Sequence, residues 1–65
     1  MIQELTEKDL AILNLLKEGH TQETIGLELF MSRTMVWVRI KRMCSQYECV
    51  GTTQLVYRLA KMGVI

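Results

Sequence analysis

The stretch that decides the fold is Thr21-Gln22-Glu23-Thr24-Ile25-Gly26-Leu27-Glu28-Leu29-Phe30-Met31-Ser32, followed by Arg33-Thr34-Met35-Val36-Trp37-Val38-Arg39-Ile40-Lys41-Arg42-Met43. Its first nine residues predict a short amphipathic helix, the next three an interruption, and the rest a second helix with four cations and no acid. Two short helices joined by a turn of three or four residues form a helix-turn-helix. A positively charged second helix suits the major groove of DNA.

Working outward, the charges of the chain are distributed unevenly. The net charge is only +1, but residues 1–30 carry two basic and six acidic side chains, a net charge of −4. Residues 31–65 carry six basic and one acidic side chain, a net charge of +5. One side of the molecule is therefore suited to phosphates and the other to water or to a protein.

Length and composition indicate a single small domain over residues 1–65 that folds rather than stays disordered, because 49% of the residues are hydrophobic and 23% charged. A domain this small has a marginal core, so we expect oligomerisation to add stability. Neither a signal peptide nor an apolar run near 18 residues occurs, and we expect a cytoplasmic, nucleoid-associated protein without a membrane segment. The Cys44-x4-Cys49 spacing with one distant His20 is not a metal-ligand pattern. We interpret both cysteines as small core or surface thiols rather than as zinc ligands or a redox pair, and we expect no metal and no cofactor.

The fold class that we predict is all-α, with four helices and no strand, because strict period-two alternation is absent. Gly19 and Gly63 are expected to end the first and last helices. Asp9 completes an imperfect capping box at the first helix. The expected N-caps are Thr6, Thr21, Ser32 and Thr52.

Apolar spacing predicts which side of each helix is buried. In the helix expected over about 33–46, a stripe of four residues lies within about 40° on a helical wheel: Val36, Ile40, Met43 and Tyr47. In the last helix the expected inward residues are Leu55, Leu59 and Met62. A glycine in a helix interior costs ~1 kcal/mol of stability, which packing must offset. We therefore expect Gly26 to lie where the next helix crosses closely.

These features, at their spacing along the chain, resemble the LuxR-type (GerE-like) helix-turn-helix domain of bacterial transcription regulators. The resemblance runs without a gap from Leu5 to Ile65. Its marks are Leu5-Thr6-Glu7-Lys8-Asp9, Ile12-Leu13, Leu16, Gly19, Ile25-Gly26, Leu29-Phe30-Met31-Ser32, Val36-x-Val38-x-Ile40, Thr53-x-Leu55-Val56 and Gly63-Val64-Ile65.

The resemblance implies a four-helix fold whose third helix enters the major groove and whose fourth helix commonly forms the dimer contact. The DNA-binding residues that we predict are Arg33, Thr34, Trp37, Val38, Lys41, Arg42 and Ser45. The dimer interface that we predict consists of Val56, Tyr57, Ala60 and Val64. Only Met1 to Glu4 precede the match, so we expect a stand-alone member of the family, bacterial or carried by a phage or plasmid.

Three kinds of function differ in how well they fit the sequence. The first is a transcription regulator that binds promoter DNA as a homodimer. The second is a protein-interaction module that pairs with a larger regulator or RNA polymerase without reading DNA. It is favoured by Trp37, which stands where the family usually has a lysine, and by the near-zero net charge. Four apolar residues are expected to project away from the core: Leu10, Leu27, Met35 and Trp37. They are either tolerated as single exposed residues or form a protein interface, and Trp37 has a third alternative, contact with a thymine methyl group or a sugar. An enzyme is disfavoured, because no nucleophile, base and orienting group occur at helical spacing and His20 is expected to be a solvated loop residue.

Overall fold

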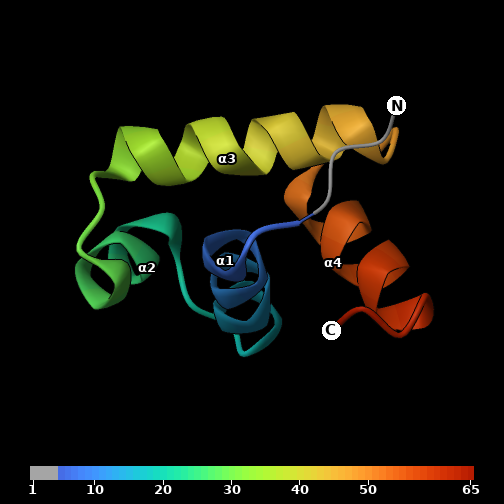
Figure 1. The fold of residues 1–65 in the computed structure, drawn as a ribbon, viewed down its shortest axis with the longest axis horizontal. Helices are drawn as coiled ribbons and strands as arrows, with labels where there is room; N and C mark the ends of the chain where they lie inside the picture. The colour runs from blue at the N-terminus through green and yellow to red at the C-terminus, as the bar shows by residue number, and fades with distance from the viewer. Residues whose placement is uncertain (1–4) are drawn as a thin grey trace.

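The computed structural model describes residues 5–65 and contains four helices in that range and no strand. They are α1 (Glu7–Lys17), α2 (Gln22–Leu29), α3 (Arg33–Gln46) and α4 (Thr52–Lys61). The prediction of an all-α fold is therefore confirmed. In Figure 1, α3 runs along one edge of the molecule, and α1, α2 and α4 all lie on the same side of it. The opposite side of α3 is left uncovered within the described chain.

Side-chain caps begin three of the helices as the sequence predicts. The Asp9 backbone N–H donates to the Thr6 hydroxyl, and the Thr6 N–H donates to the Asp9 carboxylate, which completes a capping box. Thr21 and Ser32 accept in the same way from backbone N–H groups three residues later.

The expected cap of the fourth helix is wrong by one residue. Gly51 occupies the N-cap and Thr52 is already helical, because the Leu55 N–H donates to the Gly51 carbonyl at 3.0 Å. Gly51 provides no side-chain cap. The Gln54 side chain instead accepts from the backbone N–H of Val50 at 2.7 Å, so the chain entering α4 is still held by a polar contact.

The hydrophobic core takes side chains from all four helices and from the turn before α3. Met62 was expected inward but is 57% exposed, because α4 ends at Lys61 and Met62 lies at its C-cap; Ile65 packs against the core instead. Tyr47 is only half-buried, since it lies at the C-cap of α3. The buried apolar residues are Ile12, Leu13, Ile25, Met31, Val36, Ile40, Met43, Leu55 and Leu59.

The turn between α2 and α3 depends on Gly26. A Cβ added there would lie 2.6 Å from the carbonyl oxygen of Met31, so the close neighbour is the backbone of the turn rather than a crossing helix. The Met31 N–H donates to the Gly26 carbonyl at 2.8 Å, and Phe30 takes a left-handed conformation with φ of 55°. This geometry buries Met31, exposes Phe30 and sets the direction in which α3 leaves α2.

Within residues 5–65, the longest helix has 14 residues, and no helix combines the length and hydrophobicity needed to cross a bilayer.

Candidate nucleic-acid interface

The uncovered side of α3 carries six of the seven residues that the sequence predicts to contact DNA. All six are exposed, and Val38 is exposed by 58% and Trp37 by 46%. The buried stripe of Val36, Ile40 and Met43 lies on the other side of the helix. The outward set comprises Arg33, Thr34, Trp37, Val38, Lys41 and Ser45.

Trp37 occupies the middle of this surface. The ammonium nitrogen of Lys41, one turn later, lies 5.9 Å from the centroid of the indole ring, within the range of a cation–π interaction. Trp37 also borders two surface hollows. One is lined with Gln22, Arg33 and Thr34 and lies towards the start of α2. The other lies towards the chain between α3 and α4. The aromatic side chain thus separates two recesses on a surface that carries cationic, polar and apolar side chains.

At one end of this surface, Arg33 lies beside the first turn of α2. It lines a further hollow with Thr21, Gln22 and Glu23. Thr21 is the N-cap of α2, where backbone N–H groups and the positive end of the helix dipole favour anions, while Glu23 opposes them. Within residues 5–65 no ion pair is recorded for Arg33, so its charge is available to a partner.

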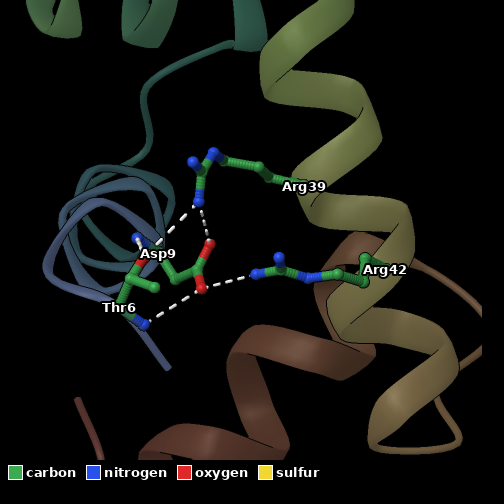
Figure 2. Close-up of polar contacts among 4 residues, drawn as sticks. All are labelled: Thr6, Asp9, Arg39 and Arg42. Atoms are coloured by element: carbon green, nitrogen blue, oxygen red, sulfur yellow. Dashed lines mark hydrogen bonds and ion pairs between the residues drawn. The ribbon is translucent and has the colours of Figure 1, made fainter. Parts of the chain in front are cut away.

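The other two arginines of α3 face α1, as Figure 2 shows. A guanidinium nitrogen of Arg39 donates to one oxygen of Asp9 at 3.0 Å, and a nitrogen of Arg42 donates to the other oxygen at 2.6 Å. Arg39 also lies within 3.4 Å of the Thr6 hydroxyl. Arg42, which the sequence placed among the DNA contacts, therefore has its charged group on the side of α3 that packs towards α1.

Asp9 is fully buried, whereas the side chains of Arg39 and Arg42 are 29% and 38% exposed. Burial on its own raises the pKa of Asp9, but hydrogen bonds from Thr6 and Arg39 and the positive charge of Arg42 outweigh it and lower the pKa below its usual value. The carboxylate is thus ionised at neutral pH and fixes two cations of α3. The capping pattern predicts only the role of Asp9 at the start of α1, whereas the i, i+3 spacing of Arg39 and Arg42 indicates that two cations share one side of the helix.

Arg58 of α4 is likewise engaged by the protein. Its guanidinium donates to the backbone carbonyls of Tyr47 and Glu48 at the end of α3. The positive charge of residues 31–65 is therefore only partly available to a ligand. On α3 the outward cations are Arg33 and Lys41.

The predicted dimer surface lies along α4 and the residues after it. Tyr57 is 64% exposed and Val64 37%, while Val56 and Ala60 are half-buried. The ammonium nitrogen of Lys61 lies 5.5 Å from the centroid of the Tyr57 ring. Tyr57 is therefore the most exposed of the four predicted interface residues.

Two further observations concern residues outside these surfaces. His20 is half-buried, with its imidazole 3.9 Å from the Glu18 carboxylate. Within the described chain, no three His, Cys, Asp or Glu side chains gather as metal ligands would. Phe30, in the turn between α2 and α3, is 97% exposed and takes a left-handed conformation, whereas its neighbour Met31 is buried.

Comparison with known proteins bears on this geometry. A family model for winged helix-turn-helix DNA-binding domains matches residues 5–46, which is more than half of the chain and spans α1, α2 and α3. A search of curated proteins and a search of solved structures found no match. The matched range holds the helix-turn-helix pair, the buried Asp9 and every residue predicted to contact DNA. The chain therefore belongs to the winged helix-turn-helix DNA-binding family.

Proposed function

We propose that this protein is a transcription regulator that binds promoter DNA by inserting α3 into the major groove. The observation that carries the proposal is the uncovered side of α3. It presents two cations, polar groups and an aromatic ring along a helix that the rest of the domain supports from behind. A 14-residue helix is about 21 Å long at ~1.5 Å per residue. The major groove, about 12 Å wide, accepts such a helix.

Each outward residue has a chemical role in this proposal. Arg33 and Lys41 contact phosphates or the acceptor edge of guanine, and the hydroxyls of Thr34 and Ser45 hydrogen-bond to bases or backbone. Trp37 and Val38 contact thymine methyl groups or sugars. We assign no DNA contact to Arg42, because its guanidinium is held by Asp9.

We further propose that the domain is of the LuxR type and acts in the cytoplasm as a homodimer. One feature supports this subtype: after the helix-turn-helix the chain continues into a fourth helix, α4, as the resemblance implies. The dimer contact uses Val56, Tyr57, Ala60 and Val64. A two-fold dimer reads half-sites about one helical turn apart, on the order of 34 Å.

The test begins with selection of binding sites from random duplexes, followed by titration of the selected site at several salt concentrations. Lys41→Glu is expected to abolish binding, since it removes an outward cation and repels phosphate. Lys17→Glu makes the same charge change on α1 and should leave most of the affinity. Equal losses in the two variants, or none in Lys41→Glu, would place the DNA-binding surface elsewhere. Analytical ultracentrifugation of the complex gives its stoichiometry.

A second function, a protein-interaction module that acts on RNA polymerase or a larger regulator, is supported by exposed apolar side chains around the turn. Leu27 is 75% exposed, Phe30 97% and Met35 53%. A gel shift at moderate salt separates the two functions: a module without DNA recognition retains all duplexes weakly and equally, whereas the proposed regulator prefers its selected site.

A further inference from the structure

The two cysteines lie on either side of the end of α3, Cys44 in its last turn and Cys49 just after it. The Cys49 N–H donates to the Cys44 carbonyl at 2.8 Å, and the Glu48 N–H donates to the Ser45 carbonyl at 3.3 Å. Glu48 between them is left-handed, with φ of 55°. These three features define a Schellman motif, in which the side chains of the first and last residues commonly touch. Here both of those residues are cysteines.

The hydrogen bond limits how far apart the two residues are. With ordinary bond lengths, a chain from one Cα through the carbonyl and N–H to the other spans at most about 7 Å. Native disulfides join Cα atoms that are roughly 4.4 to 6.8 Å apart. The upper limit on the separation of the two Cα atoms is therefore close to the upper end of the range seen in disulfides.

Three further observations indicate that the thiols are close and that their surroundings are fixed. Both cysteines are free, half-buried and line the same hollow. Burial raises the pKa of the Cys44 thiol, and the nearness of Cys49 raises it further. Arg58 of α4 donates to the carbonyls of Tyr47 and Glu48 in the intervening turn, so α4 holds the turn in place.

We propose that Cys44 and Cys49 are a redox-active pair that closes to an intramolecular disulfide in the folded protein, with a small-molecule disulfide as the oxidant. One cysteine thiolate attacks the oxidant, breaks its S–S bond and releases one thiolate, leaving a mixed disulfide. The second cysteine attacks the protein sulfur of that bond and releases the other thiolate. The protein loses two hydrogens and two electrons, and the oxidant leaves as two thiols that carry the two protons.

The site lies beside the proposed DNA-binding surface, because the hollow that it shares also contains Trp37, Lys41 and Ser45. The disulfide links the last turn of α3 to the chain entering α4. Formation of the disulfide is nevertheless independent of DNA binding, and it can be measured without any duplex.

In the experiment, the full chain is equilibrated with mixtures of oxidised and reduced glutathione. The remaining free thiols are then alkylated, and the masses of the protein species are measured by mass spectrometry. The expected product is a monomer lighter by two hydrogen atoms. The equilibrium with glutathione gives the effective concentration of one thiol at the other. This effective concentration should be at least about tenfold higher in the native chain than in guanidinium, because only the folded chain has the Schellman geometry. A lasting glutathione adduct, a disulfide between two chains, or equal effective concentrations in both solvents would overturn the proposal.

A matched control moves one thiol by a single residue. In Cys49→Ser/Val50→Cys the loop is one residue longer, so closure in guanidinium should be nearly unchanged. Val50 is 96% exposed and lies outside the Schellman motif, so the native advantage should disappear. If the shifted pair closes in the native protein as readily as the natural pair, proximity in sequence alone explains the disulfide and the proposal fails.

Discussion

Each of the two sides of α3 carries two cationic side chains, but the two pairs have different surroundings. Arg33 and Lys41 lie on the uncovered side, and within residues 5–65 neither has an acidic partner. Arg39 and Arg42 lie on the side facing α1, where both bind the buried carboxylate of Asp9. The comparison shows that a count of cations on a recognition helix overestimates the charge available to DNA. Because the buried Asp9 binds Arg39 and Arg42, two of the four cations of α3 stabilise the fold instead of facing solvent.

The largest expected effect is on stability, from the side facing α1. Asp9→Ala should lower the free energy of unfolding by about 2 to 3 kcal/mol, measured by urea denaturation at neutral pH. This value is smaller than that for a fully buried pair, because Arg39 and Arg42 are partly exposed and solvent screens them. Glu7→Ala removes an exposed acid from the same turn and should change stability by less than about 0.5 kcal/mol. Equal effects of the two changes would show that Asp9 does not hold α3.

The next effect contrasts the two pairs of cations directly. Arg33→Gln/Lys41→Gln should reduce the salt dependence of DNA binding by about 1.8 in log–log slope, since two phosphate contacts are lost at ~0.9 each. Its unfolding free energy should be nearly unchanged. Arg39→Gln/Arg42→Gln should lose stability but keep the slope under conditions in which it is folded. Fluorescence anisotropy on a selected duplex measures the slopes, and a reversed pattern would exchange the roles of the two sides.

Acid should remove the contribution of Asp9 selectively. Because its pKa is lowered in the folded state, the carboxylate stabilises the fold above its unfolded pKa, about 3.9, and this contribution is lost as the pH falls through the lower folded value. The difference between wild type and Asp9→Asn should therefore be largest near neutral pH, begin to shrink below about pH 4 and disappear only below the lower pKa of the folded state. Urea titrations at a series of pH values test this, and a constant difference down to pH 2 would contradict it.

The smallest effect is expected for a valine on the uncovered side. Val38 is 58% exposed, so Val38→Ala should change the free energy of unfolding by less than about 0.5 kcal/mol. The same substitution at the fully buried Val36 leaves a cavity and should cost about 1 to 2 kcal/mol. Thermal unfolding of the two variants under identical conditions compares the sides without any change in charge. Similar losses would show that the uncovered side is packed.

Much of the fold could be predicted because it depends on local signals. Helix periodicity, three of the four N-caps and the buried stripe of Val36, Ile40 and Met43 all follow from residues within one or two turns of each other. The errors came where an element ends. Gly51 rather than Thr52 begins α4, and Met62 falls beyond the last turn of α4, because helix ends depend on backbone hydrogen bonds that side-chain patterns predict to within a residue or two.

The candidate site could be predicted only in part. Wheel geometry placed Trp37, Val38 and Lys41 outward correctly, since that side is opposite to the buried stripe. It could not show that Arg42 binds Asp9, 33 residues earlier, because the partner is brought there by the packing of α1 on α3. The proposed cysteine pair depends on local backbone geometry that a four-residue spacing does not predict, because Glu48 must take a left-handed conformation.

The sequence by itself determined four helices, a basic second member of the helix-turn-helix and a polar, aromatic outer side of that helix, because helical periodicity and capping act over a few residues. Only the tertiary structure decided which cations of α3 remain available, because Asp9 reaches Arg39 and Arg42 only when α1 packs against α3. That outcome depends on contacts between segments whose relative positions are set by burial of the shared core. Desolvation and close packing, rather than local pattern, assign the final role of each polar side chain.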